Sequence, residues 1–103
     1  MKERVKRLID LIDYQSGSVV SKTIIKKGSG TITVFAFDKG EELSTHSASY
    51  DAMVQVLEGR VKIVINGKEY VLQKGEIIIM PANEPHSLEA ITKFKFLLTM
   101  VKG

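Results

Sequence analysis

Two stretches of the chain decide its fold: GEELSTHSASYDAMVQVLEG at residues 40–59 and GEIIIMPANEPH at residues 75–86. Each stretch begins with a glycine and carries one of the only two histidines in the sequence, His46 and His86. Glycine adopts backbone conformations that other residues avoid, so it marks the turns that aim neighbouring side chains. These stretches are therefore where we expect both the decisive turns and the functional side chains.

Short β-branched and aromatic runs flank and fill these stretches. They are separated by Gly, Asn and Pro, and Asn66-Gly67 is the pair favoured in a two-residue type I′ hairpin turn. Many short strands with no helix between them favour an antiparallel jelly roll or barrel. We therefore predict an all-β barrel over about residues 18–102. Its strands should include residues 19–25, 31–37, 53–57, 61–65, 70–72, 77–80 and 94–101.

The amino-terminal segment has a different pattern. Val5, Leu8, Ile9 and Ile12 follow one another at mostly helical spacings, with Lys and Arg between them. This stripe is typical of a short amphipathic helix. We expect that helix over about residues 4–13, packed on the sheet.

Length and composition narrow the class of protein. A chain of 103 residues is expected to form one domain, residues 1–103. Hydrophobic residues at 44% and charged residues at 26% are ordinary for a globular protein. The absence of Cys excludes disulfides, thiolate nucleophiles and Cys-ligated metals.

The charge pattern and the apolar runs bear on partners and location. The net charge of +3 comes from dispersed Lys and Arg residues rather than from one basic stripe, so we expect no nucleic-acid partner. The longest apolar run, residues 77–81, is too short to span a bilayer, and we expect no membrane partner. The first residues lack the apolar core of a secretory signal, so we expect a cytoplasmic protein.

The spacing within the two stretches resembles the cupin family. The first cupin motif runs Gly, five residues, His-x-His, three or four residues, Glu, six residues, Gly. The second runs Gly, five residues, Pro-x-Gly, two residues, His, three residues, Asn. The resemblance covers about residues 30–101 and implies a double-stranded β-helix like that of small RmlC-like barrel proteins. The matching positions are Gly40, His46, Gly59, Gly75, Pro81 and His86.

The sequence departs from the cupin pattern at half of the metal ligands. Most cupins hold a divalent metal through three His and one Glu, and here Ala48 replaces a His and Ala52 replaces the Glu. The resemblance therefore leaves His46 and His86 as candidate ligands for Zn, Mn, Ni or Fe. Catalytic zinc normally has three protein ligands, and non-haem iron has two His and a carboxylate. The second motif also has Asn83 in place of Gly and Ala90 in place of Asn.

Nearby carboxylates are poorly placed to complete such a site. Asp51 is adjacent to the lost Glu position and Glu89 is out of phase with His86, and alternate residues of a strand face opposite sides. With alanines at two ligand positions, the site should be a drier pocket that suits an apolar or partly aromatic small molecule. We expect it to be lined by Phe35, Phe37, Ala48, Tyr50, Ala52, Val54, Val56, Met80 and Phe96.

Two functions follow from this pattern. In the first, the pocket binds a small molecule together with a divalent metal held by His46 and His86. In the second, the barrel is a metal-free, non-enzymatic ligand-binding or sensor module. The sequence identifies neither a reaction nor a catalytic residue, and no Gly-x-Ser-x-Gly elbow is present. Structural use in an assembly stays open, and the resemblance implies a homodimer in which residues 19–25 pair with or cross to a partner.

Overall fold

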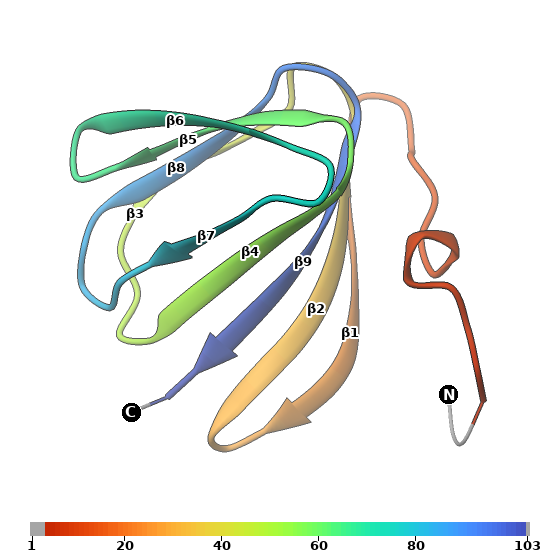
Figure 1. Ribbon diagram of the computed structural model, residues 1–103, viewed down its shortest axis with the longest axis horizontal. Helices are drawn as coiled ribbons and strands as arrows, with labels where there is room; N and C mark the ends of the chain where they lie inside the picture. Colours follow the sequence, from red (N-terminus) through yellow and green to blue (C-terminus); the bar gives the residue numbers. More distant parts are fainter. Residues whose placement is uncertain (1–3, 103) are drawn as a thin grey trace.

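Two antiparallel sheets make up the computed structural model, which describes residues 4–102. The larger sheet has the strand order β1-β2-β9-β4-β7 and the smaller has the order β3-β8-β5-β6. The two sheets face each other across a common interior (Figure 1). The strands are β1 (Val19–Lys27), β2 (Gly30–Phe37), β3 (Glu42–His46), β4 (Asp51–Glu58), β5 (Arg60–Ile65), β6 (Lys68–Gln73), β7 (Ile77–Met80), β8 (His86–Ala90) and β9 (Phe94–Val101).

Strands that are distant in sequence are neighbours in both sheets. β9 lies between β2 and β4, and β8 lies between β3 and β5. This interleaving is the arrangement of a jelly-roll barrel and confirms the predicted all-β fold. β3 and β8 were not among the predicted strands, because their Ser, Thr, Glu and His residues do not form an apolar run. Pairing with neighbours, rather than intrinsic propensity, makes them strands.

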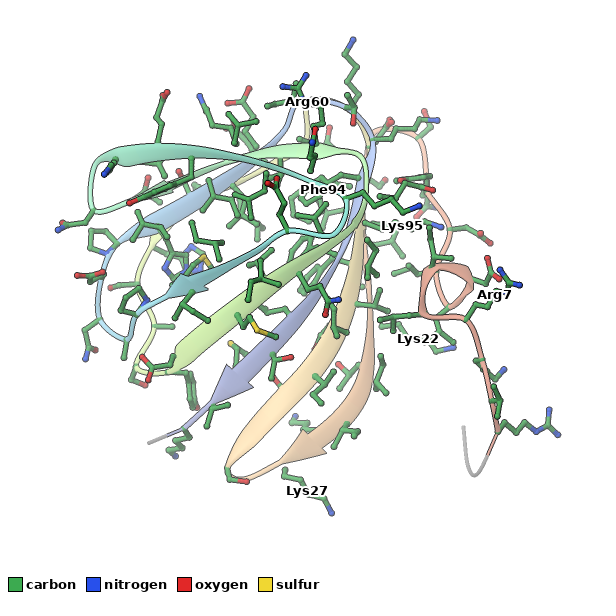
Figure 2. All side chains as sticks on the ribbon, in the orientation of Figure 1. Arg7, Lys22, Lys27, Arg60, Phe94 and Lys95 are labelled. Atoms are coloured by element: carbon green, nitrogen blue, oxygen red, sulfur yellow. The ribbon has the colours of Figure 1, made fainter. Side chains whose placement is uncertain are left out.

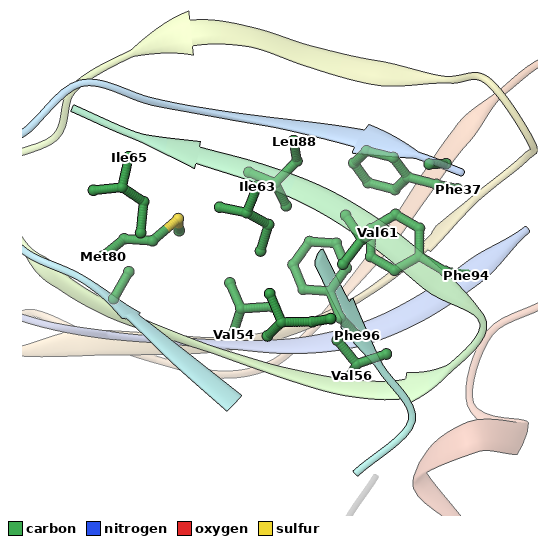
Figure 3. Packing of buried hydrophobic residues seen from close by; sticks show 13 residues of the cluster. Phe37, Val54, Val56, Val61, Ile63, Ile65, Met80, Leu88, Phe94 and Phe96 are labelled. Carbon is green, nitrogen blue, oxygen red and sulfur yellow. The ribbon is translucent and has the colours of Figure 1, made fainter. Parts of the chain in front are cut away.

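Phenylalanine rings fill one end of the interior. Phe37, Phe94 and Phe96 are at most 1% exposed, and the rings of Phe94 and Phe96 stack with centroids 5.1 Å apart. Phe35 stacks on Phe96 from the same strand pair, with centroids 4.9 Å apart. In Figure 3 the rings of Phe37, Phe94 and Phe96 lie toward one end of the cluster, whereas Met80 and Ile65 lie at the other.

The amino-terminal segment does not form the predicted helix. Its only helical element among the described residues is a single 3-10 turn, η1 (Leu8–Asp10), so the expected helix over residues 4–13 is wrong. Val5 is fully exposed, whereas Ile12 packs against Val34 and Ala36 on the outer face of the larger sheet. The stripe therefore meets the sheet only at its carboxyl end. Within residues 4–102, no helix is long and apolar enough to cross a membrane.

Polar contacts explain why this segment stays extended. The buried Lys95 donates from Nζ to the carbonyl of Ile9 at 2.8 Å, and Tyr14 donates from its hydroxyl to Glu58 Oε2. The Lys95 ammonium also lies 5.0 Å from the centroid of the Tyr14 ring. A helix this short is costly to nucleate. In a longer helix the Ile9 carbonyl would accept a backbone hydrogen bond, and here Lys95 from the sheet satisfies that carbonyl instead.

Turn residues close the barrel with left-handed backbone conformations. Asn66 and Gly67 have φ of 49° and 82°, as the predicted type I′ hairpin requires. Gly59 has φ of 81°, and a Cβ there would overlap the carbonyl oxygen of Lys93 and lie 2.8 Å from Phe94 Cβ. Gly75 has φ of 89°, but a Cβ at that position would meet nothing within 4 Å. The first of these two glycines therefore has both a conformational and a steric reason to lack a side chain.

We predict that Gly59→Ala destabilises the protein by about 2 kcal/mol more than Gly75→Ala. Both variants incur the left-handed cost of about 1–2 kcal/mol, but only Gly59→Ala forces β9 and the buried Phe94 to move, which adds an overpacking cost of about 1–3 kcal/mol. Urea unfolding of the two variants measures the difference. Equal losses of stability would show that the approach of β9 to Gly59 is not a tight constraint.

Candidate functional site

The two histidines meet in the smaller sheet. His46 ends β3 and His86 begins β8, and the two are register partners in this strand pair. Their ring centroids are 4.4 Å apart, with an interplanar angle of 69°. The pairing of β3 with β8 therefore brings residues forty positions apart into direct contact.

A bulge in β3 turns His46 to the same side of the sheet as Leu43. Leu43 pairs with Leu88 and His46 pairs with His86, so β3 contains one more residue than β8 between these two pairs. Without the bulge, the odd offset between Leu43 and His46 would place them on opposite faces of the sheet. Because of the bulge, both line the same hollow as His86 and Leu88.

An asparagine preserves the turn before His86. Asn83 occupies the position where the cupin motif has Gly, and its φ is 67°. Asparagine tolerates this left-handed region better than most non-glycine residues. Its backbone N–H donates to the carbonyl of Ala48 at 2.6 Å, and that of Asn66 donates to the carbonyl of Pro85 at 2.8 Å. Although Asn83 replaces the glycine of the motif, these two backbone hydrogen bonds therefore still anchor the segment that precedes His86.

Backbone carbonyls set the protonation of both imidazoles. His46 Nδ1 lies 2.9 Å from the carbonyl oxygen of Ser44, and His86 Nδ1 lies 3.1 Å from that of Glu84. A carbonyl oxygen only accepts, so each Nδ1 carries a hydrogen and donates it. In the neutral form, each ring then presents the lone pair of Nε2. The site therefore offers two adjacent basic nitrogens.

The two imidazoles differ in their surroundings. His86 is 6% exposed, whereas His46 is exposed. Burial lowers the pKa of His86, the neighbouring His46 lowers it further, and the Glu84 carbonyl partly opposes this by raising it. His86 is therefore neutral at neutral pH, the form in which an imidazole binds a metal or accepts a hydrogen bond.

A small apolar hollow adjoins the histidines. Its volume is about 60 Å³, which is the size of a few non-hydrogen atoms rather than a whole metabolite. Met80 and Phe96 both line it, and Met80 lies at the opposite end of the core cluster from Phe37 and Phe94 (Figure 3). The lining residues are Leu43, His46, Ala48, Ala52, Met80, His86, Leu88, Phe96, Leu98 and Met100.

The structure divides the residues expected to line the pocket into three groups. Ala48, Ala52, Met80 and Phe96 lie on this hollow. Tyr50 instead lines a separate hollow beside Lys26 and Lys27. The other four pack in the core instead of lining the hollow, because they lie toward the filled end of the barrel. They are Phe35, Phe37, Val54 and Val56.

Sequence reasoning missed four lining residues. Leu43 and Leu88 come from β3 and β8, which were not recognised as strands. Leu98 and Met100 belong to a predicted strand, at two and four positions after Phe96. Alternate residues of a strand face the same side. This alternation, counted from Phe96 and from His86, is the signal that identifies Leu98, Met100 and Leu88.

A family model described as a cupin domain matches residues 24–102. The chain belongs to the cupin family. A conserved protein of unknown function from Streptococcus pyogenes is 36% identical, with a TM-score of 0.95 over 100% of this chain and 90% of that one. A cupin 2 conserved barrel domain protein from Leptotrichia buccalis is 41% identical, with a TM-score of 0.88 over 91% of this chain and 46% of that one.

A third solved structure connects the fold to the RmlC-like cupins. An RmlC-like cupin protein from Desulfovibrio desulfuricans is 25% identical, with a TM-score of 0.82 over 95% of each chain. A comparison with curated proteins finds no match. The likenesses therefore establish a cupin of RmlC-like barrel type and carry no activity with them.

The side chains of this site that could bind a metal are the two imidazoles. No group of three or more His, Cys, Asp or Glu side chains is placed to hold a metal among residues 4–102. Asp51 Oδ1 accepts a hydrogen bond from the Ala82 N–H at 2.9 Å, and Glu89 pairs with Lys62 at 3.2 Å. The acids beside the lost ligand positions therefore have other partners. A metal bound by this cupin would take its remaining ligands from water or from a bound molecule.

We predict that His86 of the metal-free protein titrates below the ordinary imidazole value and that its pKa responds to the charge of His46. Burial and the positive charge of a protonated His46 should keep the midpoint of His86 below the ordinary value of about 6.5. The variant His46→Gln removes that charge and should raise the His86 midpoint. Proton NMR of the His86 ring signals measures the midpoint in the wild-type protein and in the variant. An unchanged midpoint in His46→Gln would mean that the rings do not sense each other.

Proposed function

We propose that this cupin binds a small molecule in the hollow beside His46 and His86, together with a divalent cation held by the two Nε2 atoms. The observation that carries this proposal is the hydrogen bonding of both Nδ1 atoms to backbone carbonyls, because it leaves both Nε2 lone pairs available beside an apolar hollow. Metal-binding histidines usually donate their other ring N–H to a carbonyl or carboxylate oxygen in this way.

The residues present fit a metal with an incomplete protein shell. Imidazole nitrogen is a suitable ligand for Zn, Ni and Fe and is accepted by Mn. Ala48 and Ala52 occupy the other two cupin ligand positions and offer no donor atom. A bound cation would supply Lewis acidity to an oxygen or nitrogen of the ligand, and the apolar lining would exclude bulk water from that contact. No reaction is proposed.

The second candidate function is metal-free ligand binding. It is favoured by the small alanines at two ligand positions and by the apolar side chains that make up the rest of the lining. In this case, the two Nε2 atoms accept hydrogen bonds from a hydroxyl or amine of the ligand. In the first candidate the imidazole lone pairs bind a cation, and in the second they accept hydrogen bonds from the ligand. A test of metal binding therefore separates the two.

We predict that Mn²⁺, Fe²⁺, Ni²⁺ or Zn²⁺ raises the melting temperature of protein purified without a metal-binding tag. A cation at one hundred times its Kd stabilises the folded state by about 2.7 kcal/mol, which corresponds to roughly 10 °C for a domain of this size. His46→Ala and His86→Ala should each abolish the rise. Asp51→Asn is the matched control and should retain it, because Asp51 contacts the Ala82 N–H instead.

Elemental analysis of the purified protein accompanies this measurement. If no metal co-purifies and none raises the melting temperature, the cation is excluded and the metal-free function stands. A rise that persists in both histidine variants would place the cation elsewhere on the protein.

We also propose that the protein forms a homodimer through β1. β1 ends the larger sheet with one edge unpaired, and Ile25 on this strand is 47% exposed. Pairing of two β1 strands would satisfy these backbone groups and continue the sheet across the dimer.

We predict that light scattering gives twice the monomer mass. Ile25→Lys should weaken the dimer by about tenfold or more, because it places like charges at the pairing edge. Ile77→Lys is the matched control: Ile77 is 56% exposed on β7 at the opposite edge of the sheet, and its replacement should leave the mass unchanged. A monomer mass at all concentrations would reject the dimer.

A further inference from the structure

A second hollow shares one lining residue with the hollow beside the histidines. It has a volume of about 230 Å³ and lies where β1 turns into β2. The shared residue is Met100, so a single flexible side chain borders both hollows. The lining of the second hollow is Lys26, Lys27, Gly28, Gly30, Thr31, Tyr50 and Met100.

A row of register partners links the two hollows across the inner face of the larger sheet. Lys26 pairs with Thr31, Thr31 with Met100, and Met100 with Ala52, which in turn pairs with Met80. Direct partners in antiparallel strands lie on the same face of a sheet. With strands about 4.8 Å apart, the three steps from β4 to β1 span roughly 14 Å. The row therefore leads from the histidine hollow to a lysine.

The lysine end of this row is cationic and lacks a counter-ion. Its lining includes Lys26 and Lys27 but no acidic residue. Within residues 4–102, the ion pairs involve Lys62 alone among the cations, so neither hairpin lysine takes part in one. Lys27 lies at the tip of the β1–β2 hairpin (Figure 2). Lys26 is the cation whose register partner, Thr31, lies on the inner face.

A buried hydroxyl lies in the same place. Thr31 Oγ1 is shielded from solvent and has no hydrogen-bond partner in the part of the chain that the structure describes, residues 4–102. A buried polar atom without a partner costs roughly 1–3 kcal/mol, so such atoms are rare in folded proteins. A ligand oxygen beside Thr31 would remove that cost. Because the hydroxyl and the Lys26 ammonium are both donors, the group they suit is an anionic acceptor, such as a carboxylate.

We propose that the ligand of this cupin is an amphipathic monocarboxylate whose carboxylate lies at Lys26 and Thr31 and whose apolar chain passes Met100 into the histidine hollow. This inference rests on the proposed function, since it assigns a ligand class to the same site. The apolar lining of the inner hollow and the cationic lining of the outer one then recognise opposite ends of a single molecule.

Methionine methyl NMR provides a direct test, because the chain carries its own reporters. Met80 and Met100 lie on the inner row, whereas Met53 pairs with Ile79 and Thr99 on the outer face of the same sheet. The probes are octanoate and octan-1-ol, added to metal-free protein labelled with ¹³C at the methionine methyl groups. Both probes should shift the Met80 and Met100 signals and leave the Met53 signal in place.

Charge dependence tests the carboxylate end. Octanoate should bind about tenfold more tightly than octan-1-ol, and Lys26→Gln should reduce its affinity to near that of the alcohol. Lys22→Gln is the matched control, because Lys22 pairs with Val34 on the outer face of the larger sheet. Thr31→Val should weaken octanoate several-fold without loss of stability, since the hydroxyl has no protein partner to lose.

Chain length tests the apolar end. From butanoate to octanoate, each buried methylene should improve affinity by about fourfold. An affinity for octanoate that is unchanged in Lys26→Gln would overturn the inference. If His46→Ala rather than Lys26→Gln lowers the affinity for octanoate, the carboxylate lies at the imidazoles. That result would support a ligand site in the barrel but reject the proposed orientation of the ligand. If neither probe moves the Met80 or Met100 signal, the ligand class is wrong, and the metal titration still decides the proposed function independently.

Discussion

The pairing of β3 with β8 is the constraint on which the site depends. These two strands have little apolar content of their own, and they are held because β8 also pairs with β5. Their register places His46 opposite His86, and the bulge in β3 turns His46 toward the same face. If that register slipped by one residue, one imidazole would face solvent and the two Nε2 atoms would no longer adjoin a common hollow.

Alanine at two ligand positions of the cupin motif gives this site a different physical character from a complete metal site. Alanine at positions 48 and 52 removes a carboxylate and an imidazole, so the burial of charge and the need to satisfy it both fall. What is left is a mostly apolar wall with two imidazoles at one side. Such a wall discriminates by shape and by one or two polar contacts, as small-molecule sites generally do, rather than by the charge of a complete metal cage.

Much of the fold was predictable from local patterns, and the site only in part. Asn66-Gly67 specified a hairpin, and the motif spacing singled out His46 and His86, whose rings the structure brings into contact. The helix at residues 4–13 was wrong because spacing alone says nothing of Lys95, a residue distant in sequence that holds the Ile9 carbonyl. Leu43 was missed for a related reason, since a bulge changes which face a side chain takes and leaves no mark in composition.

The position of β9 has a consequence for how the protein is made. This strand lies between β2 and β4, and its Phe94 and Phe96 fill the end of the interior. The larger sheet cannot assemble in its final order until residue 101 has left the ribosome, so strands synthesised earlier must wait with apolar faces exposed. A nascent chain halted before β9 would hold the larger sheet as two unconnected pairs, β1-β2 and β4-β7, and would lack two of the phenylalanines that fill the interior.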